Sequence, residues 1–533
     1  MLDCTLRDGA YIVDSKFGTS SIKGIIKKMQ DANINIIECG WLKNMPHQKG
    51  TTFYHVPEDL EQYIFEKRSD CVYTVMIDWD RYNLLENLTQ YNGKSVDAIR
   101  IVFPKKKLSE AIPLGKIVKD KGYRLFFQAA NTKEYSDEEL LRLADEINTA
   151  KPEALSVVDT FGAMYWSDLD RITSILDEHL DKDIKLGFHS HNNQQLSFAL
   201  SIQFAEKFKN RQRDIIIDSS LCGMGRGAGN TTTELMANYL NDKCQCHYDI
   251  NAIMDAIDMY MGYFLSNYKW GYSTPYLISG MYCAHVNNIA YLTTNHRTNA
   301  RDMKIIIESL SESERTKYDY DLLEQRFLDY QNKNINDDET IEKLKEITKN
   351  REILMLAPGT SILKEKSKIK KYISENKPLV IGVNAICTEY SDDYDYLFFS
   401  NRIRYEYAQE AYSEIFEKTD KIVLSSVKKH STDCIDVVNF SLLVKRGWKH
   451  FDNAVIMLFR LLDRLRIKNV AIAGFDGFSD KYSESYSDDH LPSLNDSGNW
   501  KSLNCEIREI YHDFRDSTAE TMNIRFLTES IYE

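Results

Sequence analysis

Two histidines one residue apart, His189 and His191, are the clearest sign of chemistry in this sequence. They end an apolar run at residues 185–189 that predicts a β-strand, and strand residues i and i+2 face the same side. Both imidazoles can therefore point at one ion, and Asp8, after another short apolar run, could complete a site of two histidines and one carboxylate. Such ligands suit Mn²⁺, Mg²⁺, Fe²⁺ or Zn²⁺ and leave positions open for a bidentate substrate such as a 2-oxo acid. The alternative is two structural histidines and a surface acid.

Two further polar stretches follow predicted strands. Arg7 precedes Asp8, and an arginine there could hold a developing enolate oxygen, although an ordinary salt bridge is equally open. The Gly-rich stretch 223–230, which includes Gly225 and Gly227, leads into 231–234 like a loop entering a helix N-terminus suited to anions. A flexible turn is the alternative for this stretch.

The elements that would position these residues are eight short apolar runs, which alternate with amphipathic segments in the first 225 residues. The runs are 2–5, 34–39, 71–77, 98–103, 123–128, 155–158, 185–189 and 215–219. Runs this apolar indicate parallel strands that are buried on both faces. The length suits a (β/α)₈ barrel, with a doubly wound open sheet as the main alternative. Strands one, seven and eight lie side by side once a barrel closes, so Asp8 is expected near His189 and His191.

The rest of the chain predicts a second α/β domain behind a helical segment. Residues 245–348 look largely helical, and the charged stretch 308–349 indicates a solvated connector. Short apolar runs at 353–356, 379–383, 396–400, 421–425 and 470–474, with a helix at 453–466, predict a Rossmann-like layer structure. We therefore expect an α/β protein in three parts: residues 1–295 as a TIM barrel with a helical extension, 296–349 as the connector and 350–533 as a Rossmann-like domain.

Composition narrows the classes of function. The chain has 533 residues, more than one hydrophobic core usually serves, with 43% hydrophobic and 28% charged residues. A net charge of −13 gives no broad attraction to nucleic acid or anionic lipid. No stretch reaches the ~18 apolar residues that cross a bilayer, and the N-terminal sequence lacks the apolar run of a signal peptide. We expect a cytoplasmic protein with no nucleic-acid partner and no membrane span.

The motifs of the first half resemble the DRE-TIM metallolyase superfamily, which includes 4-hydroxy-2-oxovalerate aldolase, HMG-CoA lyase and isopropylmalate synthase. The matching stretches, in the family's order, are LDCTLRDGAY, NIIECGW, VVDTFGAM, GFHSHNNQQLSFALS and DSSLCGMGRGAGNTTTE. They span residues 2 to 240, approximately. The aldolase branch is the most similar, because of the Arg7-Asp8-Gly9 motif and the Gly-x-Gly-Arg-Gly-Ala-Gly-Asn motif.

The resemblance implies a role for individual residues. Asp8, His189 and His191 would bind the divalent metal, with Mn²⁺ as the first choice and Mg²⁺, Co²⁺ or Zn²⁺ as alternatives. Arg7 would stabilise a pyruvate enolate. The remaining candidates are active-site or substrate contacts: Glu38, Asp159, Thr160, Asn192, Gly225 and Gly227. For Asn192 and the following Asn193, capping of the next helix is the open alternative.

One position departs from the family. The hydroxy-oxovalerate aldolases carry a histidine base three residues after the metal-binding aspartate, and here that position is Tyr11. A tyrosine can withdraw a proton only if its pKa falls well below its usual ~10. Either Tyr11 acts near the metal, another group is the base, or the substrate differs.

By resemblance, we expect a metal-dependent aldolase that makes or breaks a carbon–carbon bond between a 2-oxo acid and an aldehyde, in a homo-oligomer. Two alternatives stay open. One is a Claisen-type acyltransferase that uses acyl-CoA on the same barrel. The other is a non-catalytic barrel that scaffolds a C-terminal glycosyltransferase.

The stretch 351–490 resembles, through short motifs, the bacterial sialyltransferase and motility-accessory-factor glycosyltransferases, which bind CMP-sugars. That resemblance implies a nucleotide-sugar site and a place in the biosynthesis of an unusual sugar or surface polysaccharide. The implied lining residues are Gly359, Thr360, Ser361 and Asn384, with Asp476 at a nearby strand end. Ordinary turn and helix-cap roles are the alternatives for Ser361 and Asp476. His430 is a candidate base by location alone.

Overall fold

The computed structural model describes residues 1–296, 298–331, 335–427, 435–448, 450–493 and 499–533. The chain divides into two compact units, residues 1–290 with 310–318 and residues 291–309 with 319–533. Residues 296–349 are thus shared between the units, and their described part forms α14 (Ala300–Glu308), α15 (Glu312–Arg315), α16 (Tyr320–Gln331) and α17 (Asp338–Thr348). Asn299 Oδ1 accepts a hydrogen bond from the Asp302 amide, and the Ser311 amide donates to Glu314 Oε2, so new helices begin at both positions. The three-part division of the chain otherwise stays a prediction.

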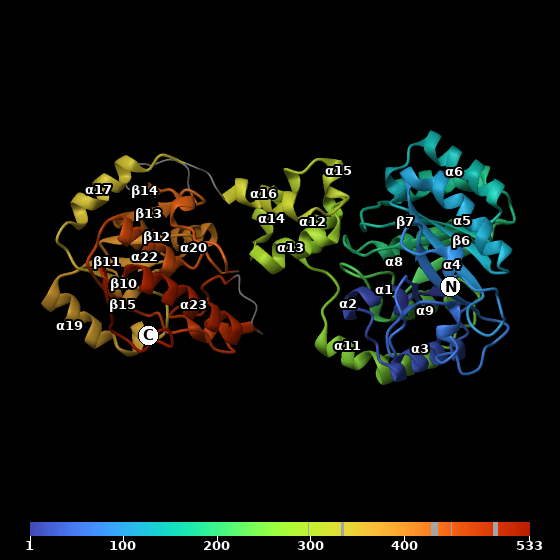
Figure 1. Ribbon diagram of the computed structural model, residues 1–533, viewed down its shortest axis with the longest axis horizontal. Coiled ribbons are helices and arrows are strands. Elements are labelled where there is room, and N and C mark those ends of the chain that lie inside the picture. The colour runs from blue at the N-terminus through green and yellow to red at the C-terminus, as the bar shows by residue number, and fades with distance from the viewer. Residues whose placement is uncertain (297, 332–334, 428–434, 449, 494–498) are drawn as a thin grey trace. The chain divides into compact units, whose positions relative to one another are not determined.

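Eight parallel strands close into a barrel in the first unit (Figure 1). They are β1 (Leu2–Asp3), β2 (Ile36–Leu42), β4 (Val72–Asp78), β5 (Ala98–Pro104), β6 (Arg124–Ala130), β7 (Ala154–Asp159), β8 (Lys185–Ser190) and β9 (Ile215–Ser219). β1 pairs with both β2 and β9, which closes the sheet, and the two-residue β3 (Phe53–Tyr54) lies beside β2. The predicted barrel is confirmed, and the open sheet is excluded for this unit.

Helices follow the strands and cover the barrel. They are α1 (Thr5–Asp8), α2 (Ala10–Val13), α3 (Thr19–Asp31), α4 (Leu84–Asn87), α5 (Leu108–Asp120), α6 (Asp137–Ala150), α7 (Trp166–His179), α8 (Ser197–Phe208) and α9 (Thr233–Cys244). A helical extension then follows, with α10 (Ile250–Ala256), α11 (Gly262–Asn267), α12 (Thr274–Met281) and α13 (Val286–His296). No helix in the described ranges has the length and apolarity that crossing a membrane requires.

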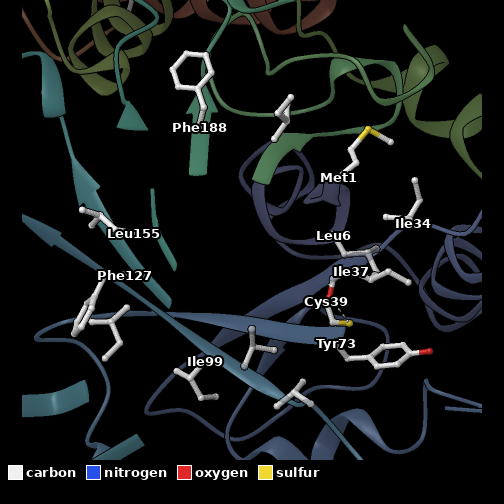
Figure 2. Close-up of a cluster of buried hydrophobic side chains, with 14 of the residues drawn as sticks. Met1, Leu6, Ile34, Ile37, Cys39, Tyr73, Ile99, Phe127, Leu155 and Phe188 are labelled. Carbon is white, nitrogen blue, oxygen red and sulfur yellow. Dashed lines mark hydrogen bonds between the residues drawn. The ribbon is translucent and has the colours of Figure 1, made fainter. Parts of the chain in front are cut away.

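The barrel strands have two buried faces. The face toward the helices contributes Ile37, Tyr73, Ile99, Phe127, Leu155 and Phe188, one from each of six strands (Figure 2). These side chains pack with helix residues such as Ile25 and Leu143 in one hydrophobic cluster. The alternate positions form a separate cluster inside the barrel. Strand alternation therefore decides which side chains the barrel interior receives.

The second unit contains a seven-stranded parallel sheet in the order β14-β13-β12-β11-β10-β15-β16 (Figure 1). The strands are β10 (Ile353–Leu356), β11 (Leu379–Val383), β12 (Tyr396–Phe399), β13 (Asp420–Leu424), β14 (Ile435–Val438), β15 (Asn469–Ala473) and β16 (Asn523–Phe526). Its helices are α18 (Ser361–Lys364), α19 (Lys366–Asn376), α20 (Arg402–Ala411), α21 (Ser413–Lys418), α22 (Ala454–Arg464) and α23 (Trp500–Thr518). The strand order reverses at β10, which is the doubly wound arrangement expected of a Rossmann-like layer.

Candidate functional site

The charged side chains of the barrel interior lie on strand positions that face inward. Ile36, Ala98 and Ile216 belong to the interior cluster. Glu38, Arg100 and Asp218 lie two residues further along the same strands, so alternation aims them inward as well. Each of the three is at most 1% exposed. They form a charged layer toward the carboxyl ends of the strands, where barrel enzymes keep their chemistry.

Asp8, His189 and His191 meet above this layer. Asp8 ends the short helix α1, His189 lies on β8 and His191 follows that strand. The Nε2 atoms of His189 and His191 lie 3.7 and 3.8 Å from Asp8 Oδ2. One ligand atom from each residue falls within 4.8 Å of the others, and all three residues are buried. The structure thus brings together the three residues that the sequence singled out.

The state of these groups fits a divalent cation. Both carboxylate oxygens of Asp8 and Nδ1 of His191 are buried without a hydrogen-bond partner among the described residues. Burial opposes ionisation of Asp8, but Arg7, His191 and His189 together lower its pKa to about 2. Burial lowers the pKa of His191 to about 4. At neutral pH the site therefore offers a carboxylate and a neutral imidazole, the protonation states that metal ligands need.

A chain of buried ion pairs supports the three residues. Arg7 Nε donates to Glu38 Oε2 at 2.7 Å, and Arg7 Nη1 lies 3.3 Å from Asp8 Oδ1. Arg100 lies between two acids, with Nη1 2.8 Å from the same Glu38 oxygen and Nη2 donating to Asp218 Oδ2 at 2.5 Å. Asp218 Oδ2 in turn lies 3.1 Å from His189 Nδ1. A carboxylate behind a metal-binding histidine fixes the orientation of its ring.

Sequence reasoning missed Arg100, Asp218 and Asn230. A charged residue inside an apolar parallel strand is a detectable signal for the first two, because such a charge must be paired to be buried. Asn230 stood in the quoted Gly-rich motif but not among the candidates. It lies beside Asp8, and a Cβ built on Gly225 would approach Asn230 Nδ2 to 2.2 Å and Asp8 Oδ2 to 3.2 Å. Gly225 therefore leaves room for the ligand set instead of contributing a side chain.

Tyr11 is placed near the site but is not activated as a base. Its ring packs edge-on against Trp41 at 6.0 Å, and the Arg226 guanidinium lies 4.8 Å from the ring centre. The residue is 44% exposed, yet desolvation of its phenol at the barrel mouth raises the pKa to about 12. Tyr11 is therefore protonated at neutral pH.

The remaining candidate residues of the barrel accept hydrogen bonds from backbone amides of the loops that follow the strands. Asp159 accepts hydrogen bonds from the Ala163 and Met164 amides, and burial raises its pKa to about 6. Thr160 Oγ1 accepts from the Asn131 amide at 2.8 Å. Asn192 Oδ1 accepts from the Ser197 amide at 3.2 Å, where α8 begins, which is the capping role left open for it.

The Gly-rich loop is tied to its neighbour by Asn193. Asn193 Nδ2 donates to Phe161 O at 2.9 Å, and its Oδ1 accepts from the Ala228 amide at 2.8 Å. Gly227 has a φ of +69°, and a Cβ there would lie 2.6 Å from Asn193 Oδ1. This loop position therefore needs glycine on two counts.

Only some of the candidate residues of the second unit line its cavity. Gly359, Asn384 and Asp476 line it, whereas Thr360 and Ser361 do not. Ser361 donates two hydrogen bonds to Asp476, from its amide to Oδ2 at 2.8 Å and from its hydroxyl to Oδ1 at 2.5 Å. Asn384 exchanges hydrogen bonds with Ser400 at 3.0 and 2.8 Å. His430 lies outside the described residues.

Fold and site together define the first unit as a (β/α)₈ barrel with a candidate two-histidine, one-carboxylate metal centre at the carboxyl ends of its strands. The HMGL-like family model matches residues 104–259. A 4-hydroxy-2-oxovalerate aldolase from Geobacillus genomosp. 3 is 23% identical over 48% of this chain and 75% of its own length. An oxaloacetate decarboxylase from Mycobacterium tuberculosis is 23% identical over 48% of this chain and 74% of its own length.

Among solved structures, the N-terminal domain of a candidate aldolase from Bacteroides vulgatus is 25% identical, with a TM-score of 0.48 over 55% of this chain and 96% of that domain. The sequence comparisons confirm the resemblance of the barrel to the DRE-TIM lyases and their aldolase branch. The resemblance of residues 351–490 to glycosyltransferases stays a prediction.

Proposed function

We propose that the first unit is a divalent-metal-dependent lyase of the aldolase type, which makes or breaks a carbon–carbon bond of a 2-oxo acid through a pyruvate-type enolate. The meeting of Asp8, His189 and His191 beside Arg7 carries this proposal. The names of two relatives support it, because 4-hydroxy-2-oxovalerate aldolase and oxaloacetate decarboxylase both denote chemistry on a 2-oxo acid. The second reactant would be an aldehyde.

Asp8, His189 and His191 would hold the cation, with Mn²⁺ as our first choice and Mg²⁺, Co²⁺ or Zn²⁺ as alternatives. A divalent cation there would supply Lewis acidity toward the oxo and carboxylate oxygens of the substrate. Asp218 keeps the His189 ring turned toward the site through the 3.1 Å contact to Nδ1. The protein itself contributes the lone pairs of buried oxygen and nitrogen atoms, which are already arranged to bind the cation.

Arg7 would stabilise the negative charge that develops on the enolate oxygen. Its Nε and Nη1 face Glu38 and Asp8, which fixes the guanidinium. Its Nη2 is buried and makes no hydrogen bond within the described part of the chain. A fixed, unengaged donor next to the ligand set is what stabilisation of an oxyanion requires. Tyr11, which stays protonated, can orient or donate to a substrate but cannot withdraw a proton at neutral pH.

For the second unit we propose a nucleotide-sugar ligand, in a pathway to an unusual sugar or surface polysaccharide. The doubly wound sheet supports this, because its cavity lies at the carboxyl ends of the strands. We also propose that the protein acts in the cytoplasm as a homo-oligomer.

Deuterium exchange at C3 of pyruvate, followed by NMR after acid quench and chelation of the metal, tests the lyase proposal. We expect exchange that requires Mn²⁺, Mg²⁺ or Co²⁺ and falls at least about 100-fold in Asp8→Asn, because the variant loses an anionic ligand. Asp14→Asn is the matched control, since Asp14 is exposed and pairs with the exposed Lys16 at 2.8 Å. Metal-independent exchange, or equal rates in Asp8→Asn and the wild type, would contradict the proposal.

A further inference from the structure

The second unit has a cavity at the carboxyl ends of five neighbouring strands. It holds about 1420 Å³ of empty space, including the part open to solvent. The loops after β10, β11, β12, β13 and β15 line it. The strand order reverses between β11 and β15, and ligands of doubly wound sheets bind at that point.

The lining of this cavity includes a half-buried cation, Arg404. Arg404 lies in the first turn of α20, where its backbone amide donates to the capping side chain of Asn401 at 3.2 Å. Its guanidinium lies 4.9 Å from the ring centre of Tyr486. Its Nη1 is buried and without a hydrogen-bond partner in the described ranges, and no described carboxylate comes within 4.0 Å of the group. Burial accordingly lowers the pKa of Arg404.

The acids near Arg404 are engaged elsewhere. Asp488 Oδ2 accepts hydrogen bonds from the hydroxyls of Tyr407 and Tyr412, at 2.9 and 2.8 Å. Glu406 accepts from Arg402 Nε at 2.8 Å. A helix N-terminus also carries partial positive charge, which disfavours a cation unless an anion accompanies it. Arg404 and the first turn of α20 therefore both favour an anion at this wall.

The loop donors after β10 are not free for an anion. The Asp476 carboxylate already accepts the Ser361 amide and hydroxyl, the donors that a phosphate would otherwise use. Next to Arg404, by contrast, the wall is aromatic, with Phe478 and Tyr486 in edge contact at 5.9 Å between ring centres. Aromatic rings beside a cation suit a ligand that combines a planar base with a negative charge.

We propose that this cavity binds a nucleotide whose phosphate is held by Arg404 and the first turn of α20. The proposal rests on the ligand role proposed for the second unit and names where the charged group of the ligand lies. Arginine suits this task because its planar guanidinium can form two parallel hydrogen bonds to phosphate oxygens. The ligand would compensate the charge that the free protein leaves unpaired.

Calorimetric titration of the full-length protein with CMP, UMP, AMP and GMP, and with the four nucleosides, tests the assignment. We expect at least one nucleotide to bind, its nucleoside to bind at least about 10-fold more weakly, and Arg404→Gln to weaken the nucleotide by about 10-fold to 100-fold. Arg301→Gln is the matched control, because Arg301 is an exposed arginine of the same unit that does not line the cavity, and it should bind as the wild type does.

The free Arg404→Gln protein is expected to melt no lower than the wild type, because the substitution removes a half-buried charge that has no described carboxylate within 4.0 Å. A normal melting temperature shows that lost binding is not lost folding. Nucleotide binding that is unchanged in Arg404→Gln, or equal to nucleoside binding, would overturn the place of Arg404 while the ligand role of the unit stands. Absence of binding by all four nucleotides at millimolar concentration would overturn both. Pyruvate exchange by the wild-type protein reports on the barrel separately.

Discussion

Arg100 in the barrel and Arg404 in the second unit are both arginines near the carboxyl ends of parallel strands, and they differ in their partners. Arg100 lies between Glu38 and Asp218, with both ion pairs at 2.8 Å or less. Arg404 has no carboxylate within 4.0 Å among the described residues. Arg100 completes a charged layer that positions other residues, whereas the charge of Arg404 is available to an anion that enters the cavity.

The same contrast separates the two candidate sites. In the barrel, the described atoms without partners include both Asp8 carboxylate oxygens and the neighbouring Arg7 Nη2, which are complementary to a cation and an oxyanion. In the second unit, the described atoms without partners on the cavity lining include Arg404 Nη1, His296 Nδ1 and Ser426 Oγ, and Arg404 supplies the cation among them. The first pattern describes a reaction centre and the second a binding pocket. Three predictions test this contrast, beginning with the largest effect.

Arg100→Met is expected to lower the free energy of unfolding by about 3 to 5 kcal/mol, because Glu38 and Asp218 stay buried without their shared cation. Arg124→Met is the matched control. Its partner Glu153 and Arg124 itself are 21% and 43% exposed, so we expect a loss below about 1 kcal/mol. Urea unfolding of both variants measures the difference. Equal losses would show that the Arg100 network contributes no more than a surface pair.

Asp218→Asn is expected to weaken Mn²⁺ binding by about 10-fold to 100-fold, because the carboxylate behind His189 orients the imidazole. Asp214→Asn, an exposed aspartate just before β9, should leave the affinity unchanged. Calorimetric titration with Mn²⁺ on variants of wild-type circular dichroism gives the affinities. An Asp218→Asn affinity within twofold of the wild type would remove Asp218 from the site.

Tyr11→Phe is expected to change the rate of pyruvate exchange by less than about threefold at neutral pH. The phenol pKa of about 12 keeps the hydroxyl protonated, so it does not withdraw the C3 proton. NMR exchange rates of this variant and of Tyr165→Phe, a 55% exposed control, decide the matter. A loss of 100-fold or more confined to Tyr11→Phe would identify Tyr11 as the proton-transfer group.

Most of the fold could be predicted from the sequence, because the eight barrel strands are apolar runs with clear ends. The predicted strands at 353–356 and 379–383 coincide with β10 and β11. β14 and β16 escaped prediction: Asp436 interrupts the apolar run of β14, and β16 alternates exposed and half-buried positions at the sheet edge. The charged stretch 308–349 was interpreted as one connector, although caps such as Ser311 divide it into separate helices.

The candidate site was less accessible to prediction. The proximity of Asp8, His189 and His191 could be predicted, because barrel closure places their strands side by side. The Arg100–Asp218 pair joins residues 118 positions apart, and no local pattern specifies that partner. In the second unit, the predicted turn at Ser361 is satisfied internally by Asp476, while Arg404 lies in a charged amphipathic helix where an arginine attracts no notice.

The most direct test of the central claim is a titration of the full-length protein with Mn²⁺, with free Mn²⁺ measured by electron paramagnetic resonance. The structure predicts one tight site per chain in the wild type and its loss in Asp8→Asn and His191→Gln, with Asp14→Asn unchanged. A wild-type protein that binds no Mn²⁺, Co²⁺ or Zn²⁺, or an Asp8→Asn variant that binds as the wild type does, would contradict a metal centre at these three residues.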